Sequence, residues 1–285
     1  MKEALFFKKL GSGIVQCELC PHFCTLKNGE RGKCKVRENR MGKLYTLVYE
    51  KPCSIALDPI EKKPLYHFYP GSKTLSLATF GCNLACQHCQ NWQISQKFIE
   101  KIKEVSPQEI IEMAKNVNSN IISFTYTEPT IFYEYMLEIA KLAKKEGMKT
   151  VMISNGYINP EPLKHLLPYI DAFNIDLKGN DKFYEKTCEG RIQPVLKTLK
   201  IIHKAGKHLE ITNLLVPDLN DSDSEIKKIV FWIKMNLDEK VPLHFSAFSP
   251  HYKLSNLKET PAETVIHAAE IAKKLGMKNV HTGNI

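Results

Sequence analysis

Short apolar segments alternate with amphipathic ones along most of the chain. Six segments are rich in apolar or β-branched residues and short enough to be buried parallel strands: 74–80, 120–127, 149–155, 172–178, 209–216 and 243–249. Between them apolar residues recur every three or four positions, which predicts helices. One helix start is marked by Ser106, Pro107 and Glu109, at the spacing of a capping box.

This alternation predicts an α/β fold built on a parallel sheet with right-handed crossovers. A short seventh strand in residues 279–284, NVHTGN, extends the series. Six strand–helix units are fewer than the eight of a closed barrel. We therefore expect an open, partial (β/α)6 barrel over residues 73–285.

Residues 1–72 show a different sequence pattern. Glycine and proline turns separate short alternating stretches such as GKLYTLVYE, and five of the nine cysteines lie here. Such a pattern indicates β-hairpins and loops. The sequence thus predicts a small, cysteine-rich N-terminal β extension over residues 1–72.

Composition places the chain among ordinary globular proteins, with 43% hydrophobic and 25% charged residues. The first residues lack the apolar core of a signal peptide, and no segment approaches the roughly 20 apolar residues of a membrane helix. These features predict a cytoplasmic protein without a membrane partner. The net charge of +9 comes from lysines spread along the whole chain. A solvated surface explains them better than a nucleic-acid partner does.

Three cysteines lie in one short loop directly after the first predicted strand, in the stretch GCNLACQHCQ. Cys82, Cys86 and Cys89 stand at spacings of four and three residues. In a reducing compartment, clustered thiols favour metal binding or catalysis over disulfides. Structural zinc takes four ligands, so a zinc knuckle would need a remote fourth residue. Three thiolates suit a [4Fe-4S] cluster with one iron left open for a small molecule.

The spacing Cys-x3-Cys-x2-Cys after the first strand resembles the signature of the radical S-adenosylmethionine (SAM) superfamily. The block IEKKPLYHFYPGSKTLSLATFGCNLACQHCQNWQIS resembles pyruvate formate-lyase activating enzyme-like proteins. Together with CELCPHFCTLKNGERGKCKVREN, it most resembles the AmmeMemoRadiSam system radical SAM enzyme subgroup. This resemblance also implies a partial barrel, a [4Fe-4S] cluster on the three cysteines and SAM on the open iron.

The resemblance further implies roles for residues in the cluster loop and at the strand ends. His88 is expected near the adenine of SAM, although a solvent-facing loop histidine is the alternative. Asn91 matches an asparagine that contacts SAM. Glu128 matches the glutamate that holds the SAM amino group, and Ser154 matches a threonine of activating enzymes.

The fourth and fifth strands add three more candidates. By the same resemblance, Asp176 is expected to hold a ribose hydroxyl or the SAM amine, and Lys178 a carboxylate. An ion pair between Asp176 and Lys178 at the barrel mouth is the alternative. Asn213 lies in an apolar strand and needs a partner, either SAM or an internal hydrogen bond.

The chain departs from the family pattern at several of these places. Tyr126 and Thr127 replace the two glycines that precede the family glutamate, so the backbone there is less free. Ile153 stands in place of an aspartate, which weakens the case for a monovalent cation. Thr212 replaces an arginine that contacts SAM, so that contact is not implied.

Four further cysteines form Cys-x2-Cys-x3-Cys-x9-Cys near the N-terminus: Cys17, Cys20, Cys24 and Cys34. Four thiolates suit a structural zinc ion, which would stabilise a region with little core, and zinc is the favoured interpretation. A second iron–sulfur cluster is the next alternative, followed by free thiols or a disulfide. Cys53 is expected to be a small core residue, and Cys188 to lie in a loop at the catalytic rim.

The leading functional hypothesis is an oxidoreductase of the radical SAM type. It would cleave SAM reductively, using an electron from a flavodoxin- or ferredoxin-like donor. The resulting 5′-deoxyadenosyl radical would abstract hydrogen from an unidentified substrate, for which a protein is one candidate. A second hypothesis is methyl or aminocarboxypropyl transfer from SAM. A third is a non-catalytic metal-binding adaptor.

Overall fold

A computed structural model describes residues 1–99 and 102–285, and its centre is one eight-stranded sheet. The strand order is β14-β13-β12-β11-β10-β9-β8-β7. The strands are β7 (Pro52–Pro59), β8 (Lys73–Thr79), β9 (Ile121–Phe124), β10 (Lys149–Ser154), β11 (Ala172–Asp176), β12 (His208–Leu215), β13 (Leu243–Ala247) and β14 (Val280–Gly283).

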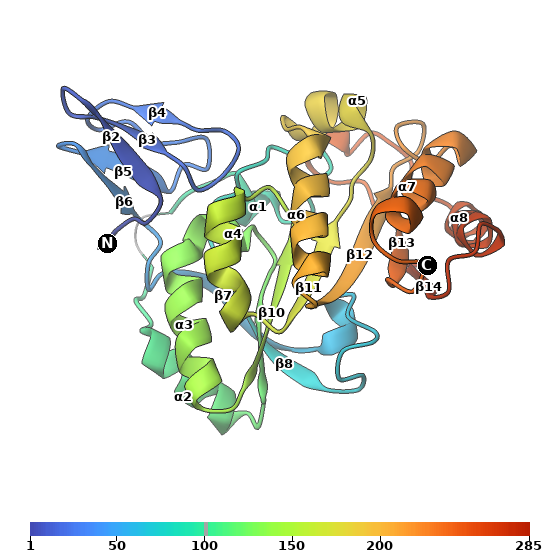
Figure 1. Cartoon of the computed structure of the whole chain (residues 1–285), viewed down its shortest axis with the longest axis horizontal. Helices are drawn as coiled ribbons and strands as arrows, with labels where there is room; N and C mark the ends of the chain where they lie inside the picture. The colour runs from blue at the N-terminus through green and yellow to red at the C-terminus, as the bar shows by residue number, and fades with distance from the viewer. Residues whose placement is uncertain (100–101) are drawn as a thin grey trace.

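The seven strands from β8 to β14 are all parallel, and each pairs with the next strand in the chain. The six predicted strands and the short seventh one are therefore confirmed, with ends that differ by a few residues. Consecutive pairing in this order gives the curved sheet of a partial barrel (Figure 1). It also brings the C-terminal ends of all seven strands to one rim.

Helices cover the outer face of this sheet (Figure 1). They are α2 (Pro107–Asn116), α3 (Tyr133–Lys145), α4 (Pro160–Leu166), α6 (Ile192–Lys204), α7 (Asp223–Asn236) and α8 (Ala262–Lys274). Two short helices, α1 (Trp92–Ser95) and α5 (Asp181–Phe183), lie in the loops that follow β8 and β11. The predicted capping box of α2 is present: Glu109 N donates to the Ser106 side chain, and the Glu109 carboxylate accepts from Ser106 N. Among the described residues, no helix is both long and apolar enough to cross a bilayer.

The N-terminal residues form two small antiparallel sheets beside the barrel, drawn in blue in Figure 1. Their strands are β1 (Lys2–Glu3), β2 (Phe7–Gly11), β3 (Ile14–Cys17), β4 (Thr25–Leu26), β5 (Arg37–Arg40) and β6 (Lys43–Thr46). β7 also lies before residue 73, yet it pairs antiparallel with β8 in the large sheet. The division into domains at residues 72 and 73 stays a prediction.

Residues 60–68, here called the floor segment, fill the inside of the barrel. Asn174 Nδ2 donates to the Pro64 carbonyl at 2.7 Å, and the Glu210 carboxylate accepts from Tyr66 N and His67 N. Glu210 also accepts from His208 and His244, so its buried charge has four donors. These bonds fix the floor segment against β11 and β12, and they give the barrel a closed bottom.

Candidate functional site

A cavity of about 850 Å³ opens at the C-terminal ends of the parallel strands. The cluster loop forms one wall, and the ends of β9 to β14 form the others. The cavity reaches down to Pro64 and Tyr66 of the floor segment. In parallel β/α architectures this rim is where ligand-binding residues converge.

The three cysteines of the predicted cluster loop all line this cavity. Cys82 Sγ accepts from Leu84 N at 3.4 Å and from Asn155 Nδ2 at 3.7 Å, and Cys89 Sγ lies 3.2 Å from Ser95 Oγ. Such donors stabilise thiolate sulfur. Three thiols on one wall of a roomy cavity fit a cluster with three protein ligands and one open iron.

The cluster loop is fixed to a neighbouring loop by its backbone. Ala85 N donates to the Cys188 carbonyl at 3.0 Å, and Gln87 N donates to the Thr187 carbonyl at 2.9 Å. Both acceptors belong to a five-residue π-helix, Tyr184–Cys188. Such helices are rare and often occur at functional sites, and this one positions the three-cysteine loop over the barrel mouth.

Cys188 is fully buried behind the loop rather than exposed at its rim. Its sulfur, Cys86 Sγ and a ring nitrogen of His88 lie within 4.8 Å of one another. A hydrogen bond from the Cys188 thiol lowers the pKa of Cys86. Cys188 does not line the cavity, so the structure places it beside a predicted cluster ligand and away from the substrate space.

His88 and Asn91 both line the cavity, as their predicted roles require. His88 is 4% exposed, and its Nδ1 has no hydrogen-bond partner among the described residues. Burial, together with the charge of Lys178, lowers the pKa of His88 to about 3, so its ring is neutral at physiological pH. Asn91 Nδ2 donates to the Tyr126 carbonyl at 2.6 Å, which ties the cluster loop to the end of β9.

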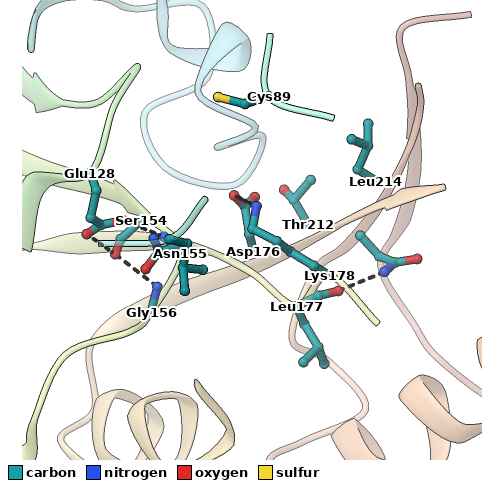
Figure 2. A network of polar contacts seen from close by, with 12 residues as sticks. Cys89, Glu128, Ser154, Asn155, Gly156, Asp176, Leu177, Lys178, Thr212 and Leu214 are labelled. Carbon is teal, nitrogen blue, oxygen red and sulfur yellow. Dashed lines mark hydrogen bonds and ion pairs between the residues drawn. The ribbon is translucent and has the colours of Figure 1, made fainter. Parts of the chain in front are cut away.

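Glu128 and Ser154 also lie together at the cavity wall (Figure 2). The Glu128 carboxylate accepts from Ser154 Oγ at 2.8 Å, Thr130 N at 2.9 Å and Asn155 N at 2.9 Å. Burial raises the pKa of Glu128. Its first role is therefore to join the ends of β9 and β10, and direct contact with SAM stays a prediction.

Asp176 and Lys178 form an ion pair of 2.7 Å at the centre of the rim (Figure 2). This is the ion pair named as the alternative from the sequence. The Asp176 side chain keeps 33% of its surface exposed and faces the cavity. Its carboxylate can therefore accept a further hydrogen bond from a ligand.

Asn213 is the one predicted SAM contact that does not line the cavity. Its Nδ2 donates to the Leu177 carbonyl at 2.7 Å, and the residue is fully buried. The internal hydrogen bond named as the alternative is therefore present, and a contact with SAM stays a prediction. The side chain joins β12 to the loop that follows β11.

Several cavity residues were not identified as candidates from the sequence. Asn155 bonds both Cys82 Sγ and, at 2.9 Å, Asn83 Oδ1, and it directly follows the predicted site residue Ser154. Gly283 and Asn284 at the end of β14 also line the cavity. Their position at the end of the predicted seventh strand was the available signal. Tyr126, in place of a family glycine, adopts a φ of 65°, a backbone conformation that glycine favours.

The four N-terminal cysteines surround one small cavity of about 10 Å³. Cys17 N donates to the Cys24 carbonyl, and Lys33 N donates to Cys24 Sγ at 3.5 Å. Burial raises the pKa of the Cys34 thiol to about 11, so a metal cation is the partner that would hold it as a thiolate. The structure thus brings together all four predicted ligands.

The sequence profile of the radical SAM superfamily matches residues 76–233, more than half of the chain. The chain belongs to the radical SAM superfamily. The matched region runs from β8 to α7 and includes the cluster loop and the rim residues of β9, β10, β11 and β12. Membership in this superfamily implies a [4Fe-4S] cluster and SAM as cofactors.

Similar proteins agree with this assignment. An uncharacterised protein of Methanocaldococcus jannaschii is 49% identical over 287 residues, covering 100% of this chain and 86% of that protein. The pyruvate formate-lyase-activating enzyme of Clostridium pasteurianum is 25% identical over 200 residues, or 65% of this chain and 81% of that enzyme. The resemblance to activating enzymes is confirmed, and the chain is a radical SAM enzyme.

A solved structure shows the same fold at low sequence identity. The radical SAM methyltransferase of Sphaerobacter thermophilus superposes with a TM-score of 0.59 and 13% identity, covering 76% of this chain and 67% of that one. This likeness confirms the partial barrel of the radical SAM superfamily.

Proposed function

We propose that the protein cleaves SAM reductively at a cluster held by Cys82, Cys86 and Cys89, and abstracts hydrogen from a substrate bound beside it. One observation carries this proposal. The three thiols and six of the seven predicted SAM-site residues line a single cavity at the C-terminal rim of the parallel sheet. When bound, the cluster and SAM supply a 5′-deoxyadenosyl radical.

The chain's own residues would orient SAM and exclude water. Asp176, with exposed carboxylate surface, would accept a hydrogen bond from a ribose hydroxyl or from the SAM amine. The neutral, buried ring of His88 would pack near the adenine. Glu128 would act mainly by fixing the Ser154–Asn155 backbone beside the cluster loop.

The substrate would occupy the part of the cavity farther from the cluster loop. That part is lined by polar side chains of the last strands and by the floor segment, including His244, Ser246, Asn284 and Tyr66. A protein segment is one candidate substrate. We propose that the enzyme works in the cytoplasm with a flavodoxin- or ferredoxin-like electron donor. The N-terminal cysteines would hold zinc or a second cluster.

The second candidate is transfer of a methyl or aminocarboxypropyl group from SAM. The observation that favours it is the altered rim: Tyr126 and Ile153 line the cavity where activating enzymes have glycine and aspartate. These side chains change how SAM can lie against β9 and β10. A different bond of SAM would then face the cluster. A non-catalytic metal-binding adaptor is the third candidate.

Product analysis separates the three candidates. The protein is reconstituted anaerobically with iron and sulfide, mixed with SAM, and reduced with dithionite. We expect 5′-deoxyadenosine by liquid chromatography and mass spectrometry. Methylthioadenosine as the main product would support aminocarboxypropyl transfer, and S-adenosylhomocysteine would support methyl transfer. Absence of SAM binding by anaerobic calorimetry would support the adaptor.

A further inference from the structure

We propose that Cys188 tunes the cluster on Cys82, Cys86 and Cys89. Its thiol donates a hydrogen bond to Cys86 Sγ, and this bond makes the cluster easier to reduce. Cys188 is thus a positioning residue that acts through a predicted cluster ligand. The inference rests on the proposed function for the presence of a cluster on Cys86, and it adds a residue that controls the reduction potential.

The backbone holds Cys188 beside Cys86. The carbonyl groups at the C-terminal end of a helix have no partner within the helix. In the π-helix Tyr184–Cys188, the last three carbonyls accept hydrogen bonds from the cluster loop. The donors are, in chain order of the acceptors, Gln87 Nε2 at 2.9 Å, Gln87 N at 2.9 Å and Ala85 N at 3.0 Å. Because Ala85 and Gln87 flank Cys86, these bonds fix its position against the π-helix.

The segment that follows the π-helix also packs on the cluster loop. A Cβ on Gly190 would lie 2.7 Å from Leu84 Cδ2, so the Gly190 backbone contacts the loop directly. Leu84 is 2% exposed, and Cys188 is fully buried. The two segments therefore enclose Cys188 and Cys86 in an interior from which bulk water is excluded.

The two sulfur atoms face each other across this contact. Cys86 Sγ and Cys188 Sγ lie within 4.8 Å of each other, and the hydrogen bond between them runs from the Cys188 thiol to Cys86. A buried cysteine stays a neutral thiol, which has one weak S–H donor, and a metal-bound cysteine is a thiolate, which accepts. Cys188 does not line the cavity, so its donor serves the cluster ligand rather than SAM or the substrate.

Reduction strengthens this hydrogen bond. An external donor of the ferredoxin or flavodoxin class gives one electron, the cluster passes from the 2+ to the 1+ state, and the proton stays on Cys188. The added charge makes the sulfur ligands better acceptors, so a donor to Cys86 Sγ stabilises the reduced state more than the oxidised state. Hydrogen bonds to the sulfurs are among the factors that set cluster potentials.

A redox titration of the substrate-free protein tests the inference. Wild type and variants are purified anaerobically and reconstituted with iron and sulfide, without SAM. Paramagnetic resonance then measures the fraction of reduced cluster at a series of fixed potentials. In Cys188→Ala we expect a ratio of reduced to oxidised cluster about threefold lower at the same potential, or a midpoint about 30 mV lower, because an S–H group is a weak donor.

Two further variants separate the hydrogen bond from packing. Cys188→Ser keeps a donor on a side chain of similar size, so it should recover most of the loss. Cys188→Val fills the space without a donor, so it should titrate like Cys188→Ala even if the smaller alanine disturbs the fold. Circular dichroism melting is measured beside each titration. A merely structural Cys188 would lower the melting temperature of the variants and leave their midpoints at the wild-type value.

Two controls isolate the signal of the radical-site cluster. Cys53→Ala removes a cysteine that lines neither the large cavity nor the N-terminal one, so it should titrate like wild type. The triple variant Cys82→Ala/Cys86→Ala/Cys89→Ala shows any signal that comes from the N-terminal cysteines. That signal is subtracted from the other spectra.

An unchanged midpoint in Cys188→Ala and Cys188→Val would overturn the inference. Equal shifts in Cys188→Val and Cys188→Ser would also overturn it, because they would assign the effect to packing. Loss of iron from all three folded variants would make Cys188 a cluster ligand instead. A cluster that titrates as expected but does not cleave SAM would contradict the proposed function and leave the role of Cys188 standing.

Discussion

The two sets of cysteines differ in what surrounds them. The N-terminal four enclose a space of about 10 Å³, whereas the loop of three lies on the wall of a cavity of about 850 Å³. The first has room for inorganic atoms only, and the second has room for organic molecules as well. The loop with only three cysteines lies beside the large cavity. This arrangement is expected, because an open metal position is useful only where there is space for a ligand.

The anchoring of the two sets differs as well. Hairpins and small sheets hold the N-terminal four, and a metal bound there would add to the folding free energy of this region. The loop of three is held by a π-helix and by side chains at the strand ends of the large sheet. Loss of metal should therefore damage the fold at the first site and the chemistry at the second.

The largest effect is expected from single Cys82→Ala, Cys86→Ala or Cys89→Ala variants. Each removes one of three cluster ligands, so each should lose the radical-site cluster and SAM cleavage while keeping the wild-type melting temperature within a few degrees. Anaerobic iron and sulfide assays with circular dichroism check this. Full cluster content in all three variants would contradict the assignment of the ligands.

Gly81→Ala is expected to disturb both sites at once. A new Cβ would meet the Cys34 carbonyl at 2.7 Å and would strain a backbone with φ +98°. We expect a loss of about 3 kcal/mol in the free energy of unfolding, measured by denaturant titration. Gly71→Ala is the matched control: its φ is +79°, but its Cβ would meet open space, so about 1 kcal/mol is expected. Equal losses would show that the two loops do not press on each other.

Glu210→Gln should change the acid stability of the barrel. Burial by itself would raise the pKa of Glu210, but hydrogen bonds from His208, His244 and the His67 backbone lower it to about 2 from 4.5. A depressed pKa contributes stability that is present above pH 4.5 and is lost as the pH falls towards 2, here about 3 kcal/mol. Wild type should lose stability more steeply than Glu210→Gln in this range. Parallel curves in acid denaturation would contradict the ionised, fully bonded carboxylate.

Asp176→Asn should give the smallest effect, confined to SAM binding. Removing the charge should weaken SAM binding about tenfold, or about 1.4 kcal/mol, because in the proposed function the side chain would accept a hydrogen bond from SAM and would balance its sulfonium. Anaerobic calorimetry on the reconstituted protein measures this, with unchanged cluster absorbance as the internal check. Glu263→Gln, on helix α8 outside the cavity, is the control. Unchanged SAM affinity in Asp176→Asn would mean that SAM lies elsewhere on the rim.

The sequence predicted the strands and the position of the three-cysteine loop, because both depend on local patterns. Apolar runs define β8 to β14, and the cysteine spacing defines the loop. The partners of polar residues were harder to predict because they come from distant parts of the chain. Asn213 needed a partner, but nothing in the strand named Leu177 as that partner. The contact of Glu210 with the floor segment was not predicted either. The pairing of β7 with β8 was missed for the same reason, since the strand itself resembles the hairpins before it.

The floor segment has a consequence for how such a pocket can diversify. It enters the barrel from the stretch between β7 and β8, and it is attached to the strands by a few hydrogen bonds, including those to Asn174 and Glu210. Pocket depth is therefore set by a short connection rather than by the strands. A change in the length of this connection would change the depth of the cavity, and so the size of molecule that it can hold. The cluster loop and the rim would remain unchanged.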